Sequence, residues 1–286
     1  MKKIITIISL ITVLNVHAQP KLIHQAIVTT KTTIVSPEED DNNLPPAPPT
    51  GGNGEEIRIM RFGGDGETKS TTWLKNDLVK TYSESDMGRT TIIRDNSKKM
   101  TTTIMEMMGK KTGFYVSDSD QALIAKRMDS MMRTRNADNN RSVFSGSPST
   151  TDIVYIDEIR KISGYDCKKA LLISTRPNGK KDSSTIWYTP DIKLQGVNST
   201  GGNFAGFGGF SPQAAAFGGM DKLNGFPIQY ERTMNRGRKM TVVVTKLITD
   251  KEVNDKEFDI PKDIELRSMK DMQNGGQGGF QMRIGG

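Results

Sequence analysis

Short segments rich in β-branched and aromatic residues alternate along the chain with turns rich in Gly, Asn and Asp. Within these segments apolar and polar residues often alternate, which is typical of strands with one face in water. The turns are too short for the helical crossovers of a parallel sheet, so the pattern predicts an antiparallel meander. The strands expected in the first half span residues 24–35, 55–62, 67–74, 78–82, 89–94, 98–107 and 113–116.

One segment has the periodicity of a helix. Residues 121–135, with the sequence QALIAKRMDSMMRTR, bring several apolar side chains to one side of a helix. A serine or aspartate at positions 117–119 can cap its start. The side chains on this predicted face belong to Leu123, Ile124, Met128, Met131 and Met132.

The second half of the chain returns to strand patterns, and turns that contain Asn178 and Asn235 join two pairs of the expected strands. In total the sequence predicts about 11–12 strands, a number that suits one large curled sheet. The expected fold class is therefore mainly β, with a single antiparallel sheet and one main helix. The strands expected in this half span residues 152–163, 164–175, 182–189, 226–234 and 238–249.

Two inserts and a tail interrupt the strand pattern. Residues 36–54 are acidic and then rich in Pro and Gly, which is typical of a flexible linker. Residues 196–219 are rich in Gly and Ala, and residues 268–286 form a Gly-rich tail that we expect to be disordered. We therefore expect one domain over residues 19–267 that carries both flexible inserts.

Four phenylalanines in the insert at 196–219 follow no strand pattern: Phe204, Phe207, Phe210 and Phe217. A solvated loop has no need of them, because full burial of each would contribute about 2–3 kcal/mol. One hypothesis is a lid that folds over the open side of the sheet. The other is a disordered, sticky loop, and the sequence leaves both open.

The first 18 residues have the pattern of an export signal. Two lysines precede an apolar run at residues 4–16, and Val16 and Ala18 place small residues where a signal peptidase would cleave before Gln19. The run is shorter than the about 20 apolar residues of a spanning helix. We expect an exported protein, periplasmic or secreted, without an integral membrane segment.

Composition limits the chemistry that the chain can perform. Hydrophobic residues make up 34% of the chain and the mean hydropathy is −0.52, which fits strands with one wet face. The formal charge of +7 falls to +5 when Lys2 and Lys3 are removed, which is mildly basic and no nucleic-acid footprint. After cleavage His24 is the only histidine and Cys167 the only thiol, so a zinc site of Cys and His and an intrachain disulfide are both excluded.

Motifs of catalysis are missing from the sequence as well. Lys168 follows Cys167 on a predicted strand and therefore points to the opposite side, so the thiol lacks a base and is expected to be a small buried side chain. There is no G-x-S-x-G motif, and the Gly runs lack the Lys-Ser/Thr of a phosphate loop. The sequence predicts a protein that is not an enzyme and has no metal or cofactor.

The second half also carries a family resemblance. Residues 161–170 read KISGYDCKKA and are followed by IWYTPDIKL, GFPIQYE, a Lys-rich strand and EFDIP. That order resembles an uncharacterised family of exported envelope proteins with the motif K-I-x-G-Y-x-C-K-K-A, which is grouped with the LolA/LolB/LppX-like lipoprotein-carrier superfamily. Early segments such as WLKNDLVKTY extend the resemblance to residues 22–262. It implies an incompletely closed, LolA-like half-barrel with a helix packed in or over its concave face, which in the best-known members holds acyl chains.

Together these observations favour a periplasmic binding or carrier-like protein with an apolar concavity for a lipid or another hydrophobic ligand. The alternative is an envelope structural or interaction module whose own side chains fill the core and which binds a protein partner, and no nucleic-acid partner is expected. Methionine adapts to varied apolar partners, although amphipathic spacing alone already predicts that most of the methionines fill the core between helix and sheet. The side chains expected to line the cavity or lid are Met105, Met107, Met128, Met131, Met132, Phe204, Phe207, Phe210 and Phe217.

Overall fold

The fold comes from a computed structural model, which describes residues 20–37, 66–86, 88–124, 126–127, 150–175, 179–194, 220–234 and 237–270. Several predictions fall outside these residues. They are the export signal at 1–18, the strand at 55–62, most of the linker at 36–54, the insert at 196–219, the three methionines of the predicted helix and the tail beyond residue 270.

Strands make up most of the described chain. In the first half they are β1 (Lys21–Ile23), β2 (Gln25–Val35), β3 (Gly66–Lys75), β4 (Leu78–Ser85), β5 (Gly88–Asp95), β6 (Met100–Met107) and β7 (Lys110–Ser117). In the second half they are β8 (Thr150–Ile162), β9 (Tyr165–Thr175), β10 (Lys181–Thr189), β11 (Ile192–Leu194), β12 (Phe226–Thr233), β13 (Lys239–Ile248) and β14 (Leu266–Ser268). The 3-10 helices η4 (Met220–Lys222) and η6 (Asp255–Phe258) complete these elements, and residues 118–124 and 126–127 are helical.

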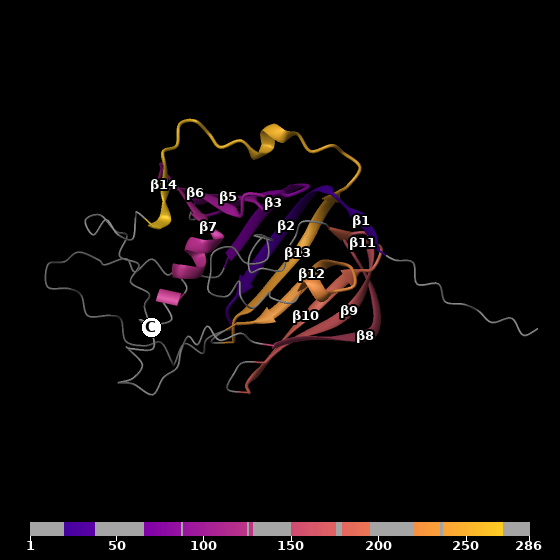
Figure 1. Cartoon of the computed structure of the whole chain (residues 1–286). Coiled ribbons are helices and arrows are strands. Elements are labelled where there is room, and N and C mark those ends of the chain that lie inside the picture. The colour runs from indigo at the N-terminus through magenta and orange to yellow at the C-terminus, as the bar shows by residue number, and fades with distance from the viewer. Residues whose placement is uncertain are drawn as a thin grey trace, which may run out of the picture.

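Twelve of these strands form one sheet in the order β14-β7-β6-β5-β4-β3-β2-β13-β12-β10-β9-β8 (Figure 1). All neighbours in it are antiparallel except β14, which pairs with β7 in parallel. The sheet is open, because β14 and β8 stand at its two ends. The expected fold class, mainly β with one large antiparallel sheet, is confirmed. β1 and β11 form a separate parallel pair.

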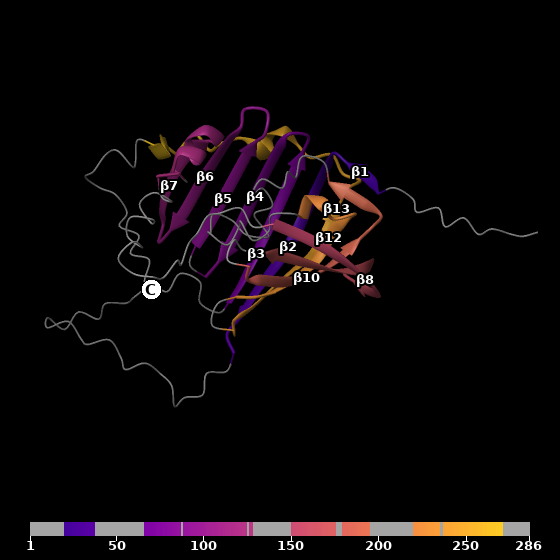
Figure 2. The ribbon, with the colours of Figure 1, turned by 60° about the horizontal axis from the view of Figure 1, so that its bottom comes forward.

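Tight turns explain why successive strands are neighbours. Met108 and Gly109 between β6 and β7 have φ values of 50° and 76°, and Ser163 and Gly164 between β8 and β9 have 50° and 86°. Two consecutive positive φ angles characterise the two-residue turns whose twist matches that of an antiparallel hairpin. The strand direction rotates along the sheet, so that β8 and β10 run across the direction of β4–β7 (Figure 2). This rotation curls the sheet and gives it an inner and an outer face.

We define the inner face by Ala26, Leu74 and Val79, which lie side by side on β2, β3 and β4 and are at most 2% exposed. Side chains alternate between faces along each strand, so the register assigns every paired residue to one face. A continuous core cluster lies mainly on β2, β9, β10, β12 and β13, with further members on β1, on β11 and just after η4. Its largest fully buried members are Tyr230, Leu172, Ile186, Leu223, Ile228, Val28, Val242 and Val244.

A strap of residues 249–265 crosses the outer face of β3–β7 and connects β13 to β14 (Figure 1). Lys75, on the outer face of β3, donates to the carbonyl of Val253 at 2.9 Å and lies 2.8 Å from Asp255. Val253 and Phe258 are buried, so the strap also contributes apolar contacts. The strap allows β14 to pair with β7 at the end of the sheet although β13 lies in its middle.

Candidate binding face

The inner face has an apolar region on the strands of the second half. Ala170, Ile186, Tyr230 and Val242 occupy adjoining positions across β9, β10, β12 and β13, and each is at most 1% exposed. The phenol of Tyr230 donates to the Ser184 hydroxyl at 3.0 Å, so this polar atom is satisfied inside the cluster. This part of the inner face is apolar and covered, which both expectations would give, an apolar concavity and a core filled by the protein's own side chains.

The corresponding part of the inner face on β2–β6 carries hydroxyl groups instead. Two adjacent rows cross these strands, one from Thr30 to Met105 and one from Val28 to Thr103. Most positions in them carry small hydroxyl side chains where an apolar concavity would place Val, Ile or Leu. We call this region the hydroxyl patch. Its six members are Thr30, Ser70, Thr72, Thr81, Ser83 and Thr103. Thr90, which is half-buried, continues the first row toward Met105 at the margin of the patch.

Four of the six hydroxyls in the patch are hydrogen-bonded in pairs. Ser70 and Ser83 lie 2.9 Å apart between β3 and β4, and Thr72 and Thr81 lie 2.9 Å apart in the next row. Both are directly opposed cross-strand pairs, the arrangement in which short side chains meet. These four groups therefore satisfy one another.

The other two hydroxyls, on Thr30 and Thr103, are buried and have no hydrogen-bond partner among the described residues. Each residue is 2% exposed. Leaving a buried hydroxyl without a hydrogen bond costs about 1–3 kcal/mol, so such groups call for a partner. Thr30 lies opposite Val244, where the patch meets the apolar cluster, and Thr103 lies between Ile92 and Phe114 at the far side.

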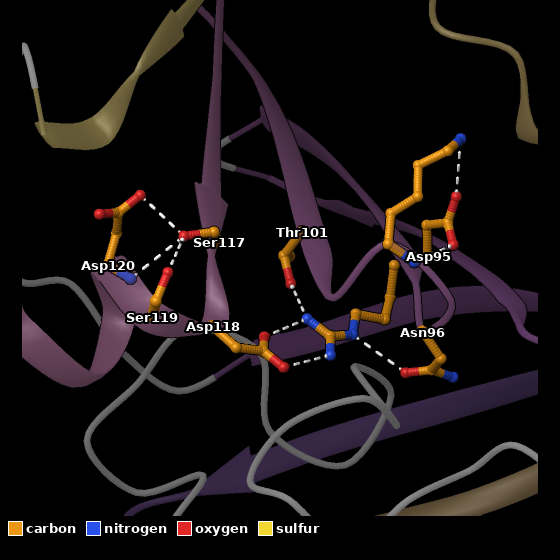
Figure 3. Close-up of polar contacts among 9 residues, drawn as sticks. Asp95, Asn96, Thr101, Ser117, Asp118, Ser119 and Asp120 are labelled. Atoms are coloured by element: carbon orange, nitrogen blue, oxygen red, sulfur yellow. Dashed lines mark hydrogen bonds and ion pairs between the residues drawn. The ribbon is translucent and has the colours of Figure 1, made fainter.

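Beside the patch, Arg94 fixes the start of the helix that follows β7 (Figure 3). Its guanidinium donates to both carboxylate oxygens of Asp118, with 2.8 Å between Nη2 and Oδ2, and also to Asn96 and Thr101 at 3.0 and 3.2 Å. The hydrogen bonds from Arg94 hold the pKa of the Asp118 carboxyl below its ordinary value. The positive charge of Arg94, which lies in the row next to the patch, is therefore neutralised by Asp118.

The first turn of this helix is capped as the sequence predicts. The Ser117 hydroxyl accepts a hydrogen bond from the backbone N–H of Asp120 at 3.1 Å and donates to its carboxylate at 2.7 Å. This arrangement satisfies an N–H that the helix leaves without an internal partner. Because Arg94 belongs to the inner face, the helix starts on the side of the sheet where the main helix was expected.

Of the side chains expected to line a cavity, two lie on described residues. Met105 is half-buried on the inner face of β6, at the end of the row that begins with Thr30. Met107 lies on the same face, in a shallow hollow at the strand ends beside Arg89, which is paired with Glu84 at 3.1 Å. The remaining seven lie outside the described residues: Met128, Met131, Met132, Phe204, Phe207, Phe210 and Phe217.

Cys167 has no catalytic surroundings. The side chain is fully buried in the core cluster, as expected from the sequence, and burial raises the pKa of its thiol to about 11. Among the described residues, no group of three or more His, Cys, Asp and Glu side chains could hold a metal ion.

We expect Cys167 to remain unmodified when the folded protein is treated with a disulfide reagent at about pH 8. Its thiol is buried and almost wholly protonated there, and the thiolate is the reactive form. The reaction is followed by absorbance, with protein in strong denaturant as the control that reacts fully. Complete modification of the folded protein within minutes would contradict the buried position.

No helix among the described residues is both long and apolar enough to span a membrane.

A search of curated proteins found no match to the chain. Similar solved structures include PNGF-II (TM-score 0.38, 13% identity, 87% of this chain and 32% of that one) and the MucA/MucB complex of Pseudomonas aeruginosa (0.34, 8%, 83% and 56%). The LolA superfamily protein NE2245 from Nitrosomonas europaea is another (0.28, 6%, 82% and 90%). The chain thus spans about a third of the length of PNGF-II.

At these identities and TM-scores the solved structures resemble the chain in general fold and say nothing of its ligand. The family model is more specific, because it matches residues 56–264, from just before β3 to the end of the strap. The chain therefore belongs to the family described as domain of unknown function DUF4412.

Proposed function

We propose that the protein is a non-enzymatic binding or carrier-like protein of the periplasm, exported through its N-terminal signal, and that its inner face binds an amphiphilic molecule. One observation carries this proposal: an apolar cluster and the hydroxyl patch adjoin on the inner face of an open, curled sheet. A ligand with an apolar and a polar part would match both regions. In this proposal the methionines and phenylalanines outside the described residues add apolar contacts.

The expected result is a mass increment of lipid size when protein purified from the envelope is measured by native mass spectrometry. Extraction with organic solvent should remove the increment, and incubation with the extract should restore it. The purified protein should also take up the fluorescent probe 1-N-phenylnaphthylamine, because the proposed ligand site includes the apolar cluster. A protein that carries no increment and does not bind the probe would contradict the proposal.

A second candidate is a protein-interaction module that uses the edge strand β8. Among the described residues no further strand pairs with the outer edge of β8. The strand exposes Val154, Tyr155 and Ile159 at 45%, 44% and 68%, which is unusual for such an edge. An extended peptide could add to such an edge by backbone hydrogen bonds. A stoichiometric partner that is lost from the Ile159→Asp variant, in a protein with no bound lipid, would favour this candidate.

A further inference from the structure

We infer that the hydroxyl patch is the subsite for an uncharged, polyhydroxylated head group, such as the sugar units of a neutral glycolipid. The inference rests on the proposed function and specifies its ligand. It starts from Thr30 and Thr103, whose hydroxyls are buried without a partner among the described residues. A hydroxyl is both donor and acceptor, and so is each hydroxyl of a sugar, so the two groups satisfy each other without regard to charge.

The position of Thr30 fixes where the two parts of the ligand would lie. Thr30 is the first hydroxyl beyond the apolar cluster, opposite Val244 and next to Ser70 in its row. An apolar chain on the cluster would therefore continue into a head group at Thr30. The amphiphile would lie across the strands, with its chain over β12 and β13 and its head over β2–β6.

The extent of the patch indicates the size of the head group. Thr30 lies on β2 and Thr103 on β6, four strands apart in the sheet order. Strands are spaced about 4.8 Å apart, so the two hydroxyls are about 19 Å apart along the sheet, and less across its concave side. A single glycerol is too short to reach both ends, whereas two or three sugar units are long enough.

The charges around the patch exclude an ionic head group. The inner positions in the two rows from Thr30 to Met105 and from Val28 to Thr103 contain no Asp, Glu, Lys or Arg. Arg94, in the adjoining row, is already bonded to Asp118, Asn96 and Thr101. A carboxylate or ammonium brought into this buried region would lose its hydration without gaining an opposite charge, which is strongly unfavourable.

Four decyl amphiphiles test the inference by displacing 1-N-phenylnaphthylamine below their micellar concentrations: decyl maltoside, decyl glucoside, decanoate and decyltrimethylammonium. The wild-type protein should bind decyl maltoside most tightly. Thr30→Val and Thr103→Val keep the shape of the side chain and remove its hydroxyl. Each substitution should therefore weaken the binding of decyl maltoside about five-fold. Affinity for the probe and for decanoate should stay within about two-fold, and the melting temperature of the free protein should not fall.

Thr29→Val is the matched control, because Thr29 precedes Thr30 on β2 and faces outward, and it should leave every affinity unchanged. If the wild type binds the probe but binds decyl maltoside no more tightly than the other amphiphiles, the assignment of the subsite is wrong and the proposed function stands. If the Val variants are more stable yet bind decyl maltoside as the wild type does, the two hydroxyls hold only water, which also overturns the inference. If the wild type binds neither the probe nor any amphiphile, the proposed function fails first.

Discussion

Replacing Gly225 by alanine is expected to lower the free energy of unfolding by about 3–4 kcal/mol. Gly225 lies between η4 and β12 with φ of +153°, a conformation that is almost restricted to glycine and costs other residues about 1–3 kcal/mol. A Cβ at this position would also lie 2.2 Å from the carbonyl oxygen of Thr189 and 2.7 Å from the ring of Tyr188. Such overpacking adds about 1–3 kcal/mol, because the carbonyl belongs to the end of β10 and cannot move independently.

Urea denaturation of the two proteins measures the effect, and Gly164→Ala serves as the control. Gly164 has φ of +86° in the turn between β8 and β9, but a Cβ there would meet no atom within 4 Å. Its substitution should therefore cost only the backbone strain, about 1–2 kcal/mol. Equal losses in the two variants would contradict the close approach of Gly225 to Thr189.

The strands of this fold could be predicted because their periodicity is local. The strand predicted at 24–35 corresponds to β2 at Gln25–Val35, and the strand predicted at 182–189 to β10 at Lys181–Thr189. The sequence pattern did not predict three of the strands, β1, β11 and β14, each of which has three residues. Segments this short have no measurable alternation, and they are strands only because distant segments such as β7 lie beside them.

The candidate site could be predicted less well, because its character depends on which strands are neighbours. The sequence shows Ser70, Thr72 and Thr103 as ordinary β-forming residues. Only the register reveals that they share one face with Thr30 and Thr81, which lie far from some of them in the sequence. Small polar residues occupy alternate positions in STTWL and TTTIM, and this was the only sign of the hydroxyl patch in the sequence. The alternation does not show which of the two faces of the sheet is the inner one.

Cross-strand pairing also explains the anchor of the helix, which leads to the second large effect. Arg94→Met is expected to lower the free energy of unfolding by about 2 kcal/mol. The variant loses charge-assisted hydrogen bonds to Asp118 and leaves Asn96 and Thr101 without their donor. The Arg94 side chain is only 11% exposed, so water replaces these bonds poorly. Hydrogen exchange should also become faster at residues 118–124, because the first turn of the helix is no longer tied to β5.

Arg89→Met provides the comparison, because Arg89 lies on the same strand and pairs with Glu84, but both side chains are more than 50% exposed. Exposed pairs contribute about 0–1 kcal/mol, so this variant should be nearly as stable as the wild type. The free energies of unfolding of the two variants should therefore differ by about 1–2 kcal/mol. Equal stability of the two variants would show that the bonds around Arg94 do not hold the helix to the sheet.

The dependence on pH gives an independent test of the same ion pair. The folded-state pKa of Asp118 lies below its ordinary value. The ion pair between Arg94 and Asp118 therefore contributes fully to the stability of the fold at any pH above the pKa of an unfolded aspartate, about 3.9. Its contribution is lost as the pH falls from there through the folded-state pKa. The stability difference between wild type and Arg94→Met should therefore be constant from neutral pH to about pH 5 and shrink below about pH 4. A difference that persists undiminished at lower pH would mean that Arg94 acts through packing and its neutral acceptors alone, because a protonated Asp118 can no longer attract the guanidinium as a charge.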